Sequence, residues 1–512
     1  MGVFVIRRLS ILLLILMVST IIMFFLVSNA GDPYFDLRTD NSPNRAAKFA
    51  ARTELLHLDQ PLPTRYLIWL RGAAKCVVPG MGCDLGRSTR GQEVSTLLVQ
   101  AMSSTLRLVT VAAVVALVLG IVVGVVSALR QYSGFDYTIT FGAFLFFSLP
   151  IFWVAVLLKQ YLAIEANNWL ADPRIGLIAS ILLSLLSAIT WGALLGGDQR
   201  RKWIVRGIAF VVTLGVLQYL SAVDWFRNPA LGPGLITAGA FAIAIGITEL
   251  IAGLRRRGVL YATLAMALIA SVGQFPLRPF LESRTWATWG TLFLLALVTV
   301  GVGIGVGMAF GGLDRGQAAR AAVFTGLFSG ALIVLDVVLR TVPSYSSLVR
   351  GRMFATVGSN TPNFEGNFWQ RFLDNGLHLV LPTLAIMLIS FAQYSRYSRA
   401  SMLETMNQDY VRTARAKGLT ERTVVVRHAF RNAMIPLATL AALDFGAIIS
   451  GAIITEHVFG WQGMGRLFTD GLIYTNPNQV MGFYLVTAVS IVVFNLLADI
   501  AYAYLDPRIR LS

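Results

Sequence analysis

The sequence predicts an all-α polytopic membrane protein. Of its 512 residues, 56% are hydrophobic and only 13% are charged, and the mean hydropathy is +0.68. A soluble domain could not bury that much apolar surface. The apolar residues form about twelve runs long enough to cross a bilayer as helices, and Lys and Arg gather at the ends of those runs. The net charge of +16 therefore indicates membrane topology rather than a nucleic-acid partner.

The first predicted span, Leu9 to Ser28, follows Arg7 and Arg8. It is longer than a signal-peptide core of about 7 to 15 residues, so we expect it to be retained. A polar outer loop over residues 29–102 follows. The remaining spans are expected near 106–129, 138–163, 175–196, 203–222, 231–252, 259–275, 286–310, 321–339, 378–394, 434–455 and 481–504. Positive residues in the short loops place both termini in the cytoplasm, which agrees with an even number of spans.

The chain has two cysteines, Cys76 and Cys83, both on the expected outer side. A Pro-Gly turn separates them in CVVPGMGC, so they could close a small disulfide loop in an oxidising compartment. The alternative is a pair of free thiols. Metal binding is not expected, because no His or second Cys pair lies nearby.

A basic segment from Gln408 to Pro436 separates two late spans. It contains the small-residue run TARAKG, which would permit close approach of a partner, and a glycine at Gly418 suited to a turn. Pro436 stands at the mouth of the next apolar span. The alternative is an amphipathic loop that lies on anionic lipid.

This segment resembles the cytoplasmic coupling ("EAA") loop of ABC-importer permeases, in the version of the dipeptide and oligopeptide family. The resemblance implies a helix, a turn and a helix that sit in a cleft of the ATPase subunit. One departure is Arg412, where the general motif has an acidic residue. The implied ATPase-coupling residues are Tyr410, Arg412, Thr413, Ala414, Arg415, Ala416, Lys417, Gly418 and Leu419.

Further motifs resemble permeases of the first-subunit type in that family. They include LDQPLPTRYLIWL and FDYTITFGAFLFFSLPIFW near the N-terminus, and HLVLPTLAI, EHVFGWQGMGRL and NLLADIAYAYLDPRIR near the C-terminus. The resemblance divides the chain into a permease core over 1–165 and 341–512, the latter with the coupling loop at 396–433. Residues 166–340 would be an inserted segment of six spans. Six is an even number, so the core topology would be preserved, and we expect the insertion to be a structural annex.

The sequence contains no G-x-x-x-x-G-K-[ST] phosphate loop, so this chain is not expected to hydrolyse ATP. The resemblance implies a non-catalytic subunit without a cofactor or metal of its own in the bacterial inner membrane. Its implied partners are a second permease, two ATPase domains that bind ATP and Mg, a substrate-binding protein and the lipid bilayer, with no nucleic acid. Di- or oligopeptides are the first substrate choice, and nickel and oligosaccharides are alternatives. A twelve-span ion-coupled secondary transporter is a further alternative.

The expected outer loop after residue 455 offers candidate gate or docking residues. These residues are Phe459, Trp461, Gly463 and Gly465. For the aromatic pair, Phe459 and Trp461, we favour the alternative of internal packing.

Ionisable residues inside or beside the spans are functional hypotheses by default. These residues are Lys159, Glu249, Asp336, Asp444 and Asp499. For each we favour a structural role, in which the charged group has a partner within the protein or at the interface. Asp444 is the strongest candidate for a functional role.

Overall fold

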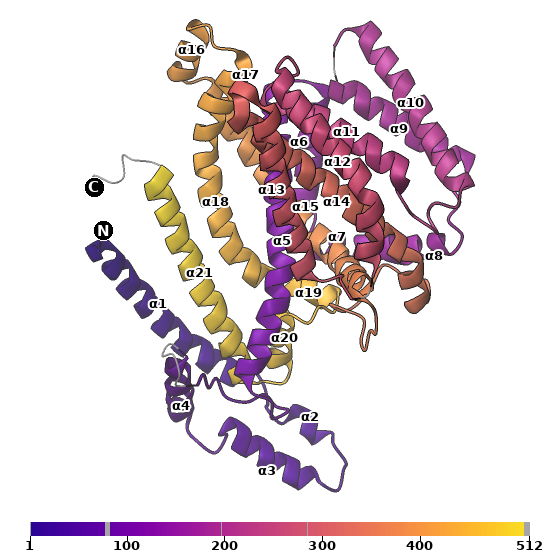
Figure 1. The fold of residues 1–512 in the computed structure, drawn as a ribbon. Helices are drawn as coiled ribbons and strands as arrows, with labels where there is room; N and C mark the ends of the chain where they lie inside the picture. The colour runs from indigo at the N-terminus through magenta and orange to yellow at the C-terminus, as the bar shows by residue number, and fades with distance from the viewer. Residues whose placement is uncertain (1, 77–81, 196, 284, 506–512) are drawn as a thin grey trace. The chain divides into compact units, whose positions relative to one another are not determined.

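The computed structural model describes residues 2–76, 82–195, 197–283 and 285–505, and these residues are almost entirely helices and their connections (Figure 1). The predicted all-α membrane fold is confirmed. Within the described residues, nine helices are long and apolar enough to span a membrane, or ten if a bent pair counts as one span. The total of twelve spans and the side of the termini stay predictions.

The chain forms two compact units, which are described separately. Unit 1 comprises Met1–Ala163, Thr356–Ser359 and His378–Ser512, and unit 2 comprises Ile164–Ala355 and Asn360–Leu377.

Unit 1 is built around long apolar helices. These are α1 (Gly2–Ser28), α5 (Val94–Leu129), α15 (Phe368–Met406, from His378 onward), α18 (Phe430–Gly451) and α21 (Pro477–Leu505). Helix α21 packs against α1 and α18, and α5 contacts α18 and α21. Glycines on α5 allow α15 to approach closely: a Cβ on Gly120 would lie 2.5 Å from the Tyr394 Cβ.

The predicted span over 138–163 is bent. Helix α6 (Gly134–Ser148) meets the segment Ile151–Ala171 at an angle of 105°. That segment consists of α7 (Ile151–Leu158), a π-helix, η1 (Lys159–Glu165), and α8 (Ala166–Ala171). The bend falls at Leu149, which is extended (φ −81°, ψ 131°). Pro150 explains it, because proline disfavours helical backbone at the preceding residue and offers no N–H for the ladder.

The polar segment over residues 29–102, which is expected on the outer side, contains three helices that the hydropathy pattern did not predict. They are α2 (Phe35–Arg38), α3 (Arg45–Leu56) and α4 (Leu62–Lys75). Tyr66 and Trp69 from α4 pack against Phe24 at the end of α1. Cys76 and Cys83 are joined in a disulfide, which closes a small loop directly after α4.

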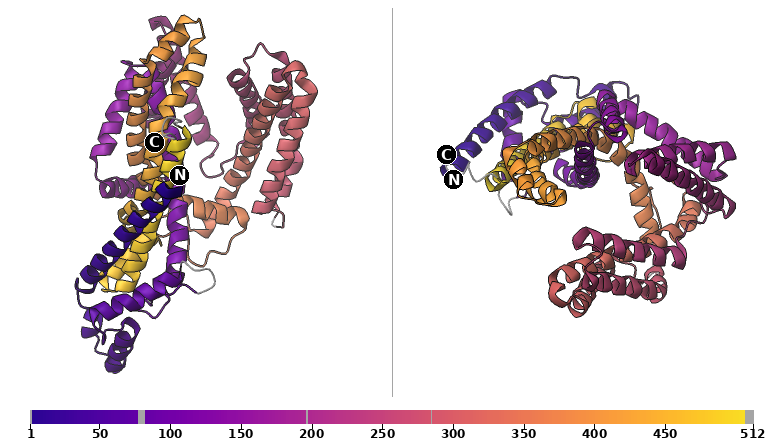
Figure 2. Two further views of the ribbon diagram at one scale, coloured as in Figure 1. Left: turned by 90° about the vertical axis from the view of Figure 1, so that its left-hand side faces the viewer. Right: turned by 90° about the horizontal axis from the view of Figure 1, so that it is seen from above.

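Unit 2 contains helices at all six positions of the expected insertion. They are α9 (Leu177–Leu195), α10 (Gln199–Ala222), α11 (Gly232–Ile251), α12 (Arg257–Glu282), α13 (Trp289–Phe310) and α14 (Arg315–Leu348). Helices α9 and α10 pack along each other, while α14 packs on α11, α12 and α13 (Figure 2). The α13–α14 contact depends on glycines, because a Cβ on Gly307 would lie 2.2 Å from the Ala319 Cα.

Four of the five ionisable groups singled out in the sequence have partners. Asp336 accepts hydrogen bonds from two backbone N–H groups at the start of α11 and ion-pairs with Arg278 and Arg340. Lys159 donates to the Val458 carbonyl, Glu249 accepts from the Leu254 N–H, and Asp444 accepts from the Tyr394 hydroxyl. The structural interpretation accounts for these four groups. The Asp499 side chain lies outside the described residues.

Candidate functional site

The segment between α15 and α18 forms a compact helical loop over residues 407–429. It lies inside the range 396–433 expected for the coupling loop and is called the coupling loop from here on. Helix α15 ends at Met406, and α16 (Asp409–Ala416) turns at Lys417 and Gly418 into α17 (Glu421–Thr423). A π-helix, η3 (Val424–Ala429), then leads directly into α18. The loop lies at one end of these helices (Figure 1).

One face of the coupling loop is anchored to the helices of unit 1. Val411 and Ala414 of α16 and Val424 of η3 are buried in one apolar cluster. Ala128 of α5 and Met402 of α15 complete that cluster, together with residues at the start of α18. The loop is therefore held to three long helices, and a force on it would reach all three.

The turn after α16 requires glycine. Gly418 has a φ of +74°, in the left-handed region that helix C-termini commonly use. Its N–H donates to the Arg415 carbonyl at 2.9 Å, and the Leu419 N–H donates to the Ala414 carbonyl at 3.4 Å. Arg415 also pairs with Glu421 at 2.7 Å across the turn. These contacts hold α16 and α17 in a fixed relation.

We expect Gly418→Val to loosen this turn, because a β-branched residue with left-handed backbone costs about 1–2 kcal/mol. Among the described residues, no heavy atom lies within 4 Å of a Cβ at this position, so we expect the effect to come from backbone conformation. Hydrogen exchange of the amides of residues 414–420 should accelerate. Gly418→Asn is the matched control, because asparagine tolerates this conformation better. Equal protection in the valine variant and the wild type would contradict the expectation.

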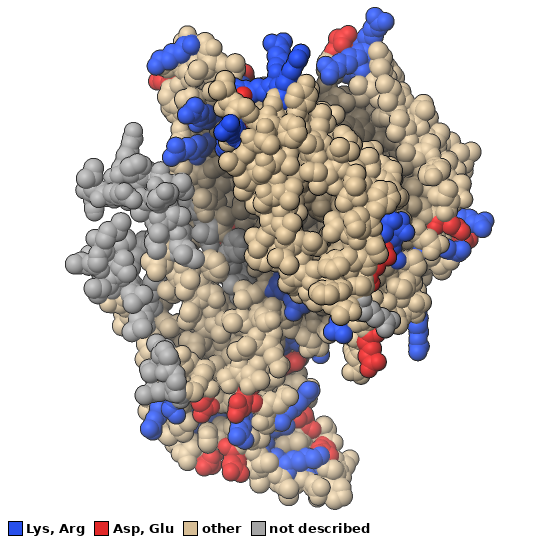
Figure 3. All heavy atoms as spheres, in the orientation of Figure 1, with Lys and Arg blue, Asp and Glu red and all other residues tan. Residues whose placement is uncertain are grey.

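The outward face of the coupling loop carries the other candidate residues. Tyr410 and Leu419 are large hydrophobic side chains, each 41% exposed. The exposed remainder comprises Arg412, Thr413, Arg415, Ala416, Lys417 and Gly418. Figure 3 shows Lys and Arg gathered on the surface over α16 and α17. Ala414 differs from its neighbours: it is 6% exposed and faces inward, so it supports the shape of the loop rather than presenting a contact.

A buried ion pair behind the coupling loop was not found from the sequence. Arg399 of α15 donates to both carboxylate oxygens of Asp136, at 2.7 and 2.9 Å. Ser127 of α5 also donates to Asp136, and so does the Tyr132 N–H. The pair joins α5, α6 and α15. Because its partners are 263 residues apart, no local spacing could reveal it; the one local signal is Ser133, which caps α6 by accepting the Asp136 N–H.

The candidate gate or docking residues form a second cluster in unit 1, around α19 (Ile453–Val458) and α20 (Met464–Ile473). Phe459 and Trp461 are 2% and 1% exposed, and the Trp461 indole N–H donates to the Ser104 carbonyl. Both aromatic residues therefore pack inside the unit. Gly463 and Gly465 leave room for a buried side chain that no local pattern in the sequence reveals, since a Cβ on Gly463 would lie 2.3 Å from a carboxylate oxygen of Glu456.

Glu456 organises this cluster. One of its oxygens accepts the Thr105 hydroxyl at 2.5 Å, and the other accepts the Gly465 N–H at 2.6 Å. Thr105 in turn accepts the Met464 N–H at 2.8 Å. The carboxylate thus ties α19 and the start of α20 to α5.

Glu456 should make stability depend on pH. Burial raises its pKa to about 7, against the opposing effect of the Thr105 hydrogen bond and the backbone N–H groups. The folded pKa lies above the ordinary value of 4.5, so the stabilising contribution is complete below that ordinary value and is lost as the pH rises towards 7. Linkage gives a change of about 3 kcal/mol over this interval.

Unfolding of the detergent-solubilised chain between pH 4 and 8 would measure this change. Glu456→Gln should flatten the profile in that interval, because the amide does not titrate. Glu404→Gln, which removes an exposed carboxyl group, should leave the profile unchanged. A Glu456→Gln profile as steep as that of the wild type would refute the assignment.

Fold and site together define a multi-pass helical membrane protein with an anchored, basic helical loop between two of its long helices. Residues 301–511 match the family model for the inner membrane component of binding-protein-dependent transport systems. The likeness to that family covers this part of the chain.

Curated relatives agree with the family match. The chain is 40% identical over 161 residues to the oligopeptide transport system permease protein OppB of Mycobacterium tuberculosis, which is 31% of this chain and 50% of that protein. It is 41% identical over 157 residues to AppB of Bacillus subtilis (31% and 48%). It is 44% identical over 146 residues to the dipeptide permease protein DppB of Escherichia coli (28% and 42%). These matches span about half the length of the relatives, and they confirm the resemblance to peptide ABC-transporter permeases.

Proposed function

We propose that this chain is a transmembrane permease subunit of an ATP-driven ABC importer for di- or oligopeptides. The observation that carries the proposal is the coupling loop, whose inner face is packed onto three long helices while its outer face presents exposed hydrophobic and basic groups. The family match over residues 301–511 and the names of the curated relatives support it.

In this proposal the coupling loop transmits the movement of an ATPase subunit to the membrane helices. Tyr410 and Leu419 would enter a cleft of the ATPase, and the basic side chains around them would face its surface. Closure of an ATPase pair on ATP would displace the loop as one body, because Val411 and Ala414 join it to the cluster on α5, α15 and α18. The Asp136–Arg399 pair would carry the displacement into α6.

The proposed complex lies in the bacterial inner membrane. Besides this chain, it contains a second, homologous permease and two ATPase domains, and an extracytoplasmic binding protein delivers the substrate. The ATPase domains would bind ATP and Mg, so this chain would be a non-catalytic subunit without a cofactor. The domain division into a core over 1–165 and 341–512 and an inserted segment over 166–340 belongs to the same proposal, with the insertion as a structural annex.

A second candidate function is import of another small solute, such as nickel or an oligosaccharide, by the same mechanism. The coupling loop does not distinguish these solutes from peptides as the substrate. The relatives named as peptide permeases favour peptides. An ion-coupled secondary transporter is disfavoured by the coupling loop, which such a transporter would not need.

The test is purification of the full chain from its native membrane under mild conditions, with identification of its partners by mass spectrometry. ATPase subunits and a second permease should accompany the wild type. Leu419→Asp should lose the ATPase subunits and retain the permease partner. Leu313→Asp, a matched change of a fully exposed leucine in unit 2, should lose neither. A chain that purifies alone and supports ion-driven uptake in vesicles would refute the proposal.

A further inference from the structure

A cavity of about 490 Å³ lies within unit 2, and its wall comes from α12, α13 and α14. Of the described residues that line it, Thr299 alone has a polar side chain, and its hydroxyl already donates to the Leu295 carbonyl at 2.8 Å. Water in the cavity would gain no hydrogen bond from the other side chains of this wall. Apolar cavities of this kind stay dry and accept apolar molecules.

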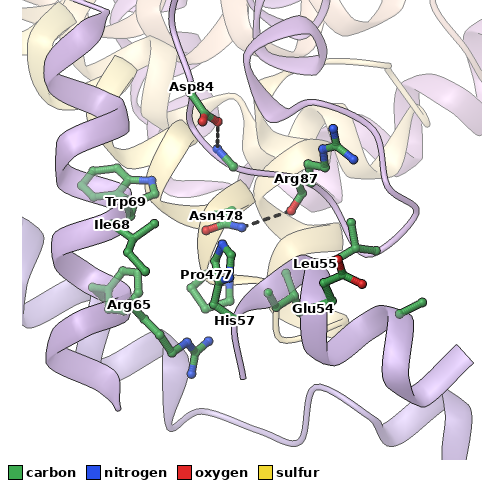
Figure 4. Close-up of a pocket in the computed structure, with 14 residues that line it drawn as sticks. Glu54, Leu55, His57, Arg65, Ile68, Trp69, Asp84, Arg87, Pro477 and Asn478 are labelled. Atoms are coloured by element: carbon green, nitrogen blue, oxygen red, sulfur yellow. Dashed lines mark hydrogen bonds between the residues drawn. The ribbon is translucent and has the colours of Figure 1, made fainter. Parts of the chain in front are cut away.

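A cavity of similar size in unit 1 has a different wall. It measures about 520 Å³, and Figure 4 shows the charged side chains of Glu54, Arg65, Asp84 and Arg87 around it. Such a wall holds water by hydrogen bonds. The apolar cavity of unit 2 therefore differs in kind and suits a hydrocarbon ligand.

The apolar cavity is long and follows its helices. Its lining residues extend from Met266 to Leu281 on α12, from Leu292 to Val302 on α13 and from Gly326 to Val334 on α14. At 1.5 Å per residue, these stretches measure about 12 to 22 Å. All three helices are long and apolar enough to span a membrane, so the cavity runs across the bilayer. One leaflet contributes about half of the hydrocarbon core, or about 15 Å, which is the depth of one lipid chain.

Packed clusters bound the cavity at both ends along the helices. Met266 at one end belongs to a buried apolar cluster with Ala318 and other residues at the start of α14. Leu281 and Ile333 at the other end belong to a second buried cluster. A ligand would therefore lie between these clusters and would not pass through to either side of the membrane.

The lateral rim of the cavity is exposed. Ile269 of α12 is 44% exposed, and Val298 and Val302 of α13 are 53% and 38% exposed. They belong to the apolar faces that the bilayer covers in a membrane protein. The cavity is thus continuous with the lipid phase, and a chain can enter from the side while its headgroup stays at the membrane surface.

Two glycines leave the space unfilled. A Cβ at Gly330 would have no heavy atom of the described residues within 4 Å, and a Cβ at Gly273 would have only the Leu277 Cδ1, at 3.8 Å. Both glycines line the cavity. A larger side chain at Gly330 would therefore occupy the cavity without a clash.

We propose that this cavity binds one acyl chain of a bilayer lipid. The chain lies along α12, α13 and α14 and buries its hydrocarbon against the apolar wall. A flexible, unbranched chain fits a cavity of this volume and length better than a rigid ring system does. No charged residue lines the cavity in the described part of the chain, so the site recognises the chain and not the headgroup. This gives the inserted segment a lipid-binding role that is independent of the proposed transport function.

The experiment uses the purified full-length chain in vesicles of phosphatidylethanolamine and phosphatidylglycerol. The probe is a phospholipid with a photoreactive diazirine midway along one acyl chain, and the cross-linked residues are mapped by mass spectrometry. We expect cross-linking of the cavity-lining residues to exceed severalfold that of Val211 and Val212, which are exposed apolar positions on α10. Probes with either headgroup should label the cavity alike.

Two filling variants and one control assign the labelling to the cavity. Gly330→Leu and Ala296→Leu place a larger side chain in the cavity from α14 and from α13, and each should reduce cavity labelling severalfold while labelling of α10 stays unchanged. Gly305→Leu makes the same change as Gly330→Leu at an exposed position on α13 that does not line the cavity and has open space around its Cβ. It should have no effect.

A second measurement counts the lipid that remains after purification in detergent. Native mass spectrometry should detect one bound phospholipid on the wild type and on Gly305→Leu, and none on Gly330→Leu. The unfolding temperature of the delipidated Gly330→Leu chain should equal or exceed that of the wild type, because leucine fills the space and favours the helix. This result would show that lost labelling does not come from misfolding.

Lipid that merely surrounds the protein predicts a different result. Cavity residues would then be labelled no more than Val211 and Val212, and the filling variants would change nothing. Either result overturns the proposal, as does an equal loss of cavity labelling in Gly305→Leu. The chain is tested without partners, so these outcomes leave the importer proposal untouched.

Discussion

Replacing Asp136 by alanine is expected to destabilise the protein by about 3–5 kcal/mol, because it leaves a partly buried Arg399 without its counter-ion. The Asp136 side chain is 3% exposed and that of Arg399 is 29% exposed. The substitution also removes the acceptor of the Ser127 hydroxyl and of the Tyr132 N–H. Unfolding of the detergent-solubilised chain would measure the loss.

Two further variants separate the buried pair from a general effect of charge. Asp409→Ala removes a carboxylate that lies 3.6 Å from Arg412 and is 97% exposed, so it should change stability by less than about 1 kcal/mol. The double variant Asp136→Leu with Arg399→Leu should recover much of the stability, because apolar side chains replace a buried pair without leaving a charge unpaired. If Asp136→Ala destabilises no more than Asp409→Ala, the pair does not hold these helices together.

Replacing Ala414 by glutamate is expected to open the coupling loop. The Ala414 side chain points into the cluster with Val411 and Val424, where a carboxylate would have no partner. Burying an unpaired charge costs several kcal/mol, so the loop should separate from the helices instead. Because the rest of unit 1 does not depend on this contact, we expect local unfolding. Hydrogen exchange of residues 409–424 would detect it, and the long helices should keep their protection.

Ala416→Glu is the matched control, since it places the same side chain two residues away on the exposed face. It should leave hydrogen exchange in the loop unchanged, with an effect on stability within about 0.5 kcal/mol. In the assembled transporter proposed above, however, Ala416→Glu should reduce co-purification of the ATPase subunits, because it adds a negative charge to the outward face of the coupling loop. Normal exchange in Ala414→Glu would show that the alanine does not anchor the loop.

Local patterns in the sequence predicted the helices well. The apolar runs coincide with α1, α5, α15, α18 and α21, and the six runs between 175 and 339 coincide with α9 to α14. Hydropathy reveals them because each lipid-exposed helix must be apolar along about 20 residues. The same criterion could not reveal α3 and α4, whose apolar residues are interspersed with charges, as in LPTRYLIWLRGAAK.

The candidate sites were predicted less completely. The basic composition and the glycine of the coupling loop are local features, so the sequence located the loop. It did not show that Ala414 faces inward while Ala416 faces outward. The residues that organise the surroundings, Asp136 and Glu456, were missed because their partners lie 263 and 351 residues away.

The sequence by itself determined the membrane class, the positions of most helices and the place of the coupling loop, because hydrophobic periodicity and turn residues act over short stretches of chain. The tertiary structure alone decided which charges are neutralised in pairs and which alanine anchors the loop. These features depend on contacts between distant segments. Their free energy comes from burial, and burial is set by packing of the whole unit rather than by any local pattern.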